Sequence, residues 1–174
     1  MNEVYAKTLL GSLCELEEMT TKIDGLVYAR AMNAHHFRAG QSTLSQMEEI
    51  VKLMNKKNDL INLKVIADEA FRQMECEPAQ MLRARFVEGA SHDVLIRRYG
   101  YAERTYFRKF EKAVASFVLT LERAGFDDAW FRKHYFSQRW LKERYEKLQR
   151  FAEGKSDREH ISAKRIRPTE TTNA

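Results

Sequence analysis

The sequence predicts an all-α protein with a long N-terminal helical arm, a central helix-turn-helix and a C-terminal aromatic helix. Three observations lead to this prediction. The 174 residues include only two Pro and seven Gly, the residues that most often interrupt helices. Apolar residues recur at intervals of three and four along most of the chain, which is the helical period. The composition, 44% hydrophobic and 32% charged, is typical of a largely helical soluble protein.

Residues 1–77 form the predicted arm, which consists of two long helices. The first is expected from about Glu3 to Phe37, and the second follows a break at residues 35–40 with Ser42 as its N-cap. The second helix carries a heptad seam of apolar residues with one polar member: Leu44, Met47, Val51, Met54, Asn58, Ile61 and Val65.

A single Asn in such a seam can fix the register and the number of chains in a coiled coil. Two arrangements fit the seam. In one, the two helices of the arm fold back on each other and Asn58 faces solvent. In the other, the seam pairs two copies of the chain. We expect a hairpin and a dimer to use the same apolar seam, so the sequence leaves this choice open.

Residues 78–124 predict three short helices separated by two tight breaks. Pro78 suits the first turn of the first helix, because its missing N–H costs nothing there. Gly89 ends this helix, and Ser91 can cap the next one by accepting a backbone N–H. The apolar residues expected to face inward in these two helices are Leu82, Phe86, Val87, Val94, Leu95 and Tyr99.

The second helix of this segment, His92 to Tyr99, leads into a turn at Gly100, where glycine adopts a left-handed conformation that bulkier residues resist. A third helix starts near Ala102 or Glu103 and continues to a stop at Gly125. Its inward positions step by four, three and four: Tyr106, Phe110, Ala113 and Phe117. Two helices joined by a short turn containing Gly are typical of a helix-turn-helix.

The outer face of the third helix is the candidate nucleic-acid interface. Eight Lys or Arg and four Asp or Glu lie between Pro78 and Val118, a net charge of +4. The planar fork of Arg fits guanine O6 and N7, and Lys or Arg can also hold phosphates. The candidate DNA-binding residues are Arg97, Arg98, Glu103, Arg104, Thr105, Arg108, Lys109 and Lys112. The alternative interpretation is an ordinary helical subdomain with a solvated basic face.

We expect the basic candidates to have different roles. Arg104 and Arg108 lie four residues apart on one helical face, which favours contact with bases in the major groove. The expected phosphate contacts are made by Lys109, Lys112, Arg97 and Arg98. Glu103 either accepts from a cytosine amine or complements the helix N-terminus.

About forty residues of this segment resemble region four of sigma-70-type factors, in the variant found in phage regulators of the ArpU and RinA type. The similar elements are the Leu82…Arg85-Phe86-Val87-Glu88-Gly89 run, Ser91, Tyr99-Gly100-Tyr101, Glu103-Arg104-Thr105-Tyr106-Phe107-Arg108 and Lys112-Ala113-Val114. Two departures stand out: Ala102 replaces the usual Ser or Thr cap, and Val94-Leu95-Ile96 replaces the usual Glu-Ile-Ala. The resemblance implies a phage- or prophage-derived regulator of transcription that reads duplex DNA with its third helix.

Residues 125–154 predict an amphipathic helix that is dense in aromatic residues, interleaved with basic ones, and ends near Gly154. Aromatic and basic residues together can bind single strands by stacking. At helical spacing, a core or a partner interface is the preferred interpretation. Residues 155–174 are polar and aperiodic and predict a flexible tail. Charge is also uneven, because residues 1–77 carry −3 and residues 119–174 carry +4, which favours a nucleic-acid partner for the basic part.

The sequence carries no signature of catalysis. It has no phosphate-binding Gly loop, HExxH motif or serine-hydrolase elbow, and the adjacent His35 and His36 would diverge on a helix. Cys14 and Cys76 fit neither a disulfide framework nor a CxxC metal pattern, which favours a reducing cytoplasm. We expect no enzyme activity, metal, cofactor or membrane span.

Three classes of function stay open. The first, which we prefer, is a transcriptional regulator that binds double-stranded DNA as a homodimer, paired through the arm or the aromatic helix. The second is a sigma-like adaptor that contacts RNA polymerase more than DNA. The third is a phage DNA-packaging protein of the small-terminase kind. Salt-sensitive duplex binding without polymerase favours the first over the second, and a ring-sized oligomer favours the third.

Overall fold

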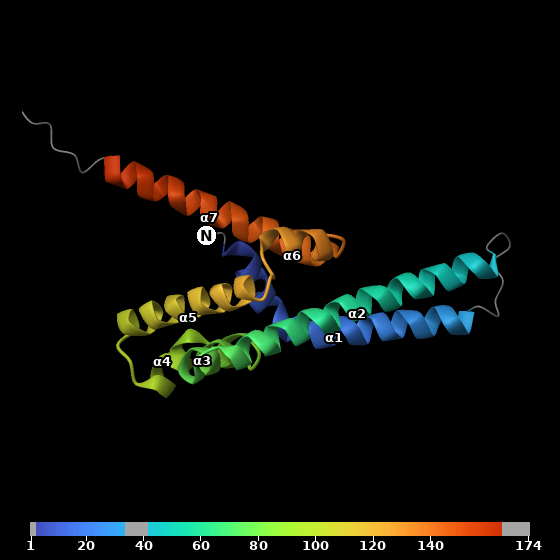
Figure 1. Ribbon diagram of the computed structural model, residues 1–174, viewed down its shortest axis with the longest axis horizontal. Helices are drawn as coiled ribbons and strands as arrows, with labels where there is room; N and C mark the ends of the chain where they lie inside the picture. The colour runs from blue at the N-terminus through green and yellow to red at the C-terminus, as the bar shows by residue number, and fades with distance from the viewer. Residues whose placement is uncertain (1–2, 34–41, 165–174) are drawn as a thin grey trace, which may run out of the picture.

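A computed structural model describes the backbone of residues 3–33 and 42–164 and the side chains of residues 3–32 and 42–154. Over these residues the chain forms seven helices and no strands, which confirms the all-α prediction (Figure 1). The helices are α1 (Val4–Asn33), α2 (Thr43–Gln73), α3 (Cys76–Phe86), α4 (His92–Tyr99), α5 (Glu103–Arg123), α6 (Asp128–Tyr135) and α7 (Arg139–Lys164). No helix of the described residues is long and apolar enough to cross a bilayer.

Helices α1 and α2 run side by side as an arm that projects from the remaining helices (Figure 1). Ser42 caps α2 as predicted, because its side-chain oxygen accepts from the backbone N–H of Ser45 at 3.2 Å. Helix α1 is described to Asn33. Its predicted extension to Phe37 and the predicted break at residues 35–40 therefore lie outside the described residues.

The arm folds back on itself, and ion pairs join its two helices. The ammonium of Lys57 lies 2.7 Å from the carboxylate of Asp24. The ammonium of Lys64 lies 2.6 Å from the carboxylate of Glu17. The buried residues of α2 are Leu60, Leu63, Ala67, Ala70 and Phe71. None of these belongs to the heptad seam of α2, so the hairpin uses a different face from the seam. The expectation that a hairpin and a dimer would use the same face was therefore wrong.

The core lies where the base of the arm meets α5, α6 and α7. The first half of α1 is buried there, with Tyr5, Leu9 and Leu16 each at most 2% exposed. Thr8 and Ser12 are buried in the same stretch. Their hydroxyls donate to backbone carbonyls of α1 at 2.8 and 2.7 Å, so burial leaves neither hydroxyl without a hydrogen bond.

The aromatic segment forms two helices rather than the single one predicted. Asp127 caps α6 by accepting from the backbone N–H of Trp130 at 2.7 Å, and the chain turns at residues 136–138 before α7 begins. The turn brings Phe131 of α6 and Tyr145 of α7 into one core, with ring centroids 6.3 Å apart. Burial of these rings confirms that the aromatic pattern marks a core. One continuous helix would hold the two rings 14 residues apart, about 20 Å along its axis.

Helix α7 continues past the predicted end at Gly154 to Lys164, so the first part of the predicted tail is helical. The helix is fixed to α1 by Arg144, whose guanidinium donates to the carbonyl of Gly11 and, at 2.5 Å, to the carboxylate of Glu15. Beyond this anchor α7 extends away from the arm (Figure 1).

Candidate nucleic-acid interface

Helices α3, α4 and α5, which cover the segment predicted to be a helix-turn-helix, form a unit around a small core of their own. This core consists of Met81 and Ala84 of α3, Leu95 of α4 and Tyr106 of α5. The unit is docked on the arm rather than tethered to it, because the rings of Phe71 in α2 and Phe117 in α5 lie 5.1 Å apart. The arm therefore determines where the unit sits.

The two breaks in the unit have the geometry that the sequence predicts. Gly89 and Gly100 adopt positive φ angles of 73° and 65°. The side-chain oxygen of Ser91 accepts from the backbone N–H of Val94 at 3.3 Å and caps α4. Helix α5 begins at Glu103, and Ala102 gives it no side-chain cap. The acidic Glu103 in the first turn is then the charge that complements the positive end of the helix.

The inward residues were predicted correctly except for two valines. Leu82, Leu95 and Tyr106 are fully buried, but Val87 is 50% exposed and Val94 is 46% exposed. In each case two successive apolar residues were expected to face inward together. Neighbours on a helix diverge by about 100°, and in these two pairs the valine is the residue that turns outward.

A row of exposed basic residues runs along the outer face of α5. Arg104, Arg108 and Lys112 are spaced four residues apart, so their side chains share one face of the helix. None of the three forms a hydrogen bond or ion pair with another described residue. Arg97 in α4 is exposed in the same way, whereas Thr105 is half-buried. We call Arg104, Arg108 and Lys112 the basic row.

Two other basic side chains that were predicted to contact phosphates, Arg98 and Lys109, are paired with acidic residues of the same unit instead. Arg98 donates to Glu88 at 3.3 Å. Lys109 lies 2.8 Å from the carboxylate of Glu77 in α3 and 2.7 Å from the hydroxyl of Tyr101, and its ammonium also lies over the Tyr101 ring. Hydrogen bonds from Lys109 and Tyr101 lower the pKa of Glu77, and the same carboxylate raises the pKa of Lys109. This ion pair fastens α5 to α3.

The role of His92, which joins α4 to α5, was not predicted. Its Nδ1 atom lies 2.8 Å from the hydroxyl of Tyr106, and its ring packs against Phe107 and Phe110 at centroid distances of 5.3 and 5.1 Å. Burial, and then the nearby charge of Arg85, lower the pKa of His92, so the ring is neutral at pH 7.

Phe107 was also not among the predicted site residues. It is 39% exposed, and it lies on α5 between the basic residues Arg104 and Arg108 in sequence. A large apolar side chain at the outer surface of a basic helix is a signal that the sequence does contain. The helical wheel shows it only once Tyr106 and Phe110 are known to take the inward positions.

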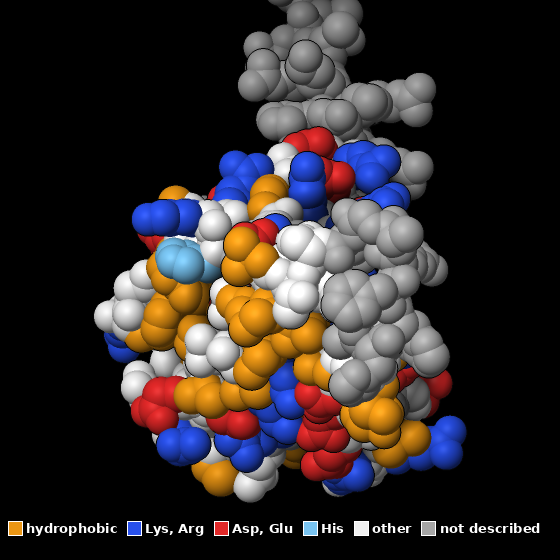
Figure 2. All heavy atoms as spheres, turned by 90° about the vertical axis from the view of Figure 1, so that its right-hand side faces the viewer, with side chains coloured by type: hydrophobic (Ala, Val, Ile, Leu, Met, Phe, Trp, Pro, Cys, Tyr) orange, Lys and Arg blue, Asp and Glu red, His pale blue; other side chains and the backbone are white. Residues whose placement is uncertain are grey.

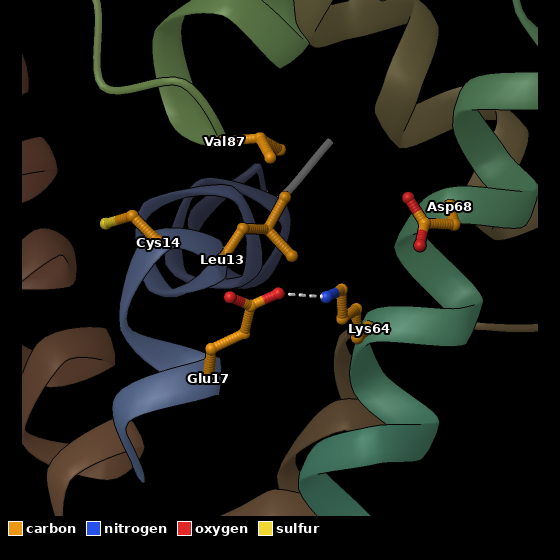
Figure 3. A pocket seen from close by; sticks show the side chains of 6 residues that line it. All are labelled: Leu13, Cys14, Glu17, Lys64, Asp68 and Val87. Carbon is orange, nitrogen blue, oxygen red and sulfur yellow. Dashed lines mark hydrogen bonds and ion pairs between the residues drawn. The ribbon is translucent and has the colours of Figure 1, made fainter. Parts of the chain in front are cut away.

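A hollow of about 100 Å³ lies at the junction of α1, α2 and the end of α3 (Figure 3). Glu17 and Lys64 point toward each other across it, while Cys14 points away from them. The other acidic group of the lining, Asp68, pairs with Arg83 at 4.0 Å. Because its charged groups pair with one another or with Arg83, the hollow is a structural junction rather than a site for chemistry.

No group of three or more His, Cys, Asp or Glu side chains in the described part of the chain is arranged to hold a metal ion. Comparison of the chain with protein-family models, with curated proteins and with solved structures found no match in any of the three.

Proposed function

We propose that the chain binds double-stranded DNA in a sequence-specific manner and regulates transcription, with α5 as the reader helix. The observation that carries this proposal is the basic row. Its three cations are exposed and have no partner among the described residues, while the opposite face of α5 is buried at Tyr106 and Ala113. A rigidly mounted helix with free Arg and Lys side chains is the arrangement that phosphates and base edges require.

The dimensions of the basic row suit the major groove. Arg104 and Lys112 are eight positions apart, which is about 12 Å along a helix, close to the width of the groove. Arg104 lies in the first turn of α5, the end of a reader helix that usually meets base edges. Lys112, further along, is then suited to a phosphate, and Phe107 to the methyl group of a thymine.

The regulator class is supported by the resemblance to sigma-70 region four and to phage regulators of the ArpU and RinA type. The elements that carry the resemblance include the Ser91 cap, the Gly100 turn and the start of α5 at Glu103. The excess of positive charge between residues 78 and 118 also fits a nucleic-acid partner.

Selection of bound sequences from a random duplex pool, followed by binding measurements on the selected site, tests this proposal. Arg104→Ala and Arg108→Ala should each cost about 1–3 kcal/mol on the selected site and relax the sequence preference at one position. Arg123→Ala is the matched control, because Arg123 is an exposed Arg at the far end of the same helix. If both test variants bind the selected site like the control while keeping their helical content, α5 is not the reader.

A second candidate is the RNA polymerase adaptor, and exposed apolar residues on α4 and α5 favour it. Val94 and Phe107 are 46% and 39% exposed, and apolar side chains at an exposed surface suit a protein partner. Replacing Val94 with Ser separates the two functions. If the chain is an adaptor, this variant loses binding to purified polymerase, and the wild-type chain fails to bind duplex DNA alone at low salt.

A further inference from the structure

Helix α2 exposes an apolar stripe along the arm, the seven heptad positions named above. Six are apolar and between 43% and 67% exposed: Leu44, Met47, Val51, Met54, Ile61 and Val65. The seventh, Asn58, is exposed as well. The stripe covers about 32 Å of helix. Figure 2 views the molecule from the side toward which the arm projects and shows hydrophobic side chains at the surface among charged ones.

Helix α1 does not cover this stripe. Lys57 and Lys64 each precede a stripe residue, Asn58 and Val65, and both are turned to α1 by their ion pairs with Asp24 and Glu17. These pairs lie beside the buried face of α2 and are consistent with its rotation, which the burial of Leu60, Leu63 and Ala67 favours more strongly. The face with Leu60 and Leu63 then packs on α1, and the stripe faces outward.

We infer that the α2 stripe is the interface with a second copy of this chain, in a parallel pair that places Asn58 against the partner's Asn58. The spacing is the first reason. A straight α-helix drifts out of register with a strict seven-residue repeat, so three uninterrupted heptads fit a supercoiled pair of helices. The a positions are Leu44, Val51, Asn58 and Val65, and the d positions are Met47, Met54 and Ile61. The β-branched Val51 and Val65 at a positions favour two strands, whereas the β-branched Ile61 at a d position does not add to this preference.

Asn58 selects the parallel orientation. In a parallel pair an a residue faces the same residue of the partner, so the two Asn58 amides can donate to and accept from each other. In an antiparallel pair an a residue faces a d residue, and the d residues of the stripe are Met47, Met54 and Ile61, which are all apolar. The amide of Asn58 would then be buried without a hydrogen-bond partner, which is costly.

The size and the charge of the surface fit the same occupant. At roughly 30 Å² per methyl or methylene group, the six half-exposed side chains offer on the order of 400 Å² of apolar surface in each copy. That is about half of what each partner contributes to a standard stable interface, before the flanking residues are counted. In the parallel register Lys64 lies beside the partner's Glu69, so the two charges do not repel each other. Each of them already has an ion-pair partner in its own chain, Glu17 for Lys64 and Arg72 for Glu69.

A parallel pair brings the two helix-turn-helix units to the same end of the assembly, because α2 leads directly into α3 in each copy. The inference itself does not depend on DNA binding. Its tests are made without DNA, so its failure and the failure of the proposed function are distinguishable.

Cysteine cross-linking tests the interface and its orientation. In a background of Cys14→Ser and Cys76→Ser, the Asn58→Cys variant should form a disulfide-linked dimer under mild oxidation, because facing a positions lie within disulfide reach. An antiparallel pair would instead cross-link a variant carrying both Met47→Cys and Asn58→Cys but not Asn58→Cys alone. That result, or a lack of cross-linking in both variants, overturns the inference.

Light scattering gives an independent readout of the oligomeric state. The wild-type chain should be a dimer, and a variant with Met54→Lys and Ile61→Lys should be a monomer of unchanged helical content. Leu119→Lys is the matched control, because Leu119 is 41% exposed on α5, outside the stripe, and Ile61 is 43% exposed. A monomeric wild type at all concentrations, a ring-sized oligomer, or equal dissociation of the control variant contradicts the α2 interface.

Discussion

His92 of α4 and Tyr106 of α5 are joined by a hydrogen bond of 2.8 Å between the imidazole Nδ1 and the phenol oxygen. Tyr106 is fully buried, and the His92 ring meets it edge-on at a centroid distance of 5.6 Å. The pair joins α4 to α5, the two helices on either side of the Gly100 turn. The contact between these helices therefore includes a titratable side chain whose protonation is opposed by burial.

The first prediction follows from this pair. Burial and the charge of Arg85 lower the pKa of His92, an effect that Asp93 only partly offsets. Above the ordinary pKa of about 6.5 the imidazole is neutral in the folded and unfolded chains, and its contribution to stability is complete. Below that pH the unfolded chain takes up a proton that the folded chain resists. Stability is then lost until the pH passes the folded pKa.

Urea unfolding between pH 7.5 and pH 5.5 measures this loss. His92→Gln keeps a polar partner for Tyr106 but does not titrate, so its midpoint should fall less than that of the wild type over the same range. Carboxylates with lowered pKa, such as Glu17 and Glu77, add their own loss only at more acidic pH. Parallel pH profiles for the two chains would mean that protonation of His92 does not contribute to the loss of stability.

The second prediction compares two glycines. Gly100 has a φ angle of 65°, so Gly100→Ala should cost about 1–2 kcal/mol through backbone strain, even though nothing lies within 4 Å of the added methyl group. Gly25 lies in the exposed part of α1, also with open space around it, and Gly25→Ala should stabilise the helix by about 0.5–1 kcal/mol. Opposite shifts of the thermal midpoint are expected, and equal shifts would contradict the turn assignment.

The third prediction uses two neighbouring residues of α4. Leu95 is fully buried in the small core of the helix-turn-helix unit, so Leu95→Ala should destabilise the unit by about 2–5 kcal/mol. Val94 is 46% exposed, and Val94→Ala should change stability by only about 0.5 kcal/mol. Circular dichroism during urea unfolding distinguishes the two. A large effect of Val94→Ala would show that this valine packs against something in solution.

Local patterns in the sequence were sufficient to predict the all-α class and several of the helix ends. The Ser42 and Ser91 caps and the turns at Gly89 and Gly100 depend on residues close in the chain, and all four have the predicted geometry. The division of the aromatic segment into α6 and α7 was not predicted, because no Pro or Gly marks it. It follows from the tertiary packing of the rings of Phe131 and Tyr145 on one core.

The part of the site that depends on distant residues was beyond sequence reasoning. Glu77 and Lys109 are 32 positions apart, and no periodicity in the sequence connects them. Their ion pair nevertheless determines which of the two lysines of α5 is already paired within the protein. The arm shows the same limit. The heptad pattern of α2 is plain in the sequence, but the face that is buried is a different one, with Leu60, Leu63 and Ala67, and its packing depends on residues of distant helices.

The last prediction concerns the two lysines of α5, both of which the sequence assigned to phosphates. Lys112 is exposed and has no partner among the described residues, whereas Lys109 is held by Glu77 and Tyr101. If α5 binds duplex DNA, Lys112→Ala should reduce the slope of log K against log salt by about one unit. Lys109→Ala should leave the slope nearly unchanged, because the charge that it removes is already neutralised.

Replacing Glu77 provides the reverse test. Glu77→Gln keeps the size of the side chain but removes the charge that holds Lys109. The freed ammonium should then strengthen binding to any duplex and steepen the salt dependence. Titration of one fixed duplex at several salt concentrations, with the wild type and the three variants, measures all these slopes. Equal slopes for Lys109→Ala and Lys112→Ala would mean that the ion pair between Glu77 and Lys109 breaks when the chain binds DNA. In that case Glu77→Gln would have little further effect, because the wild-type chain would already present both lysines to the phosphates.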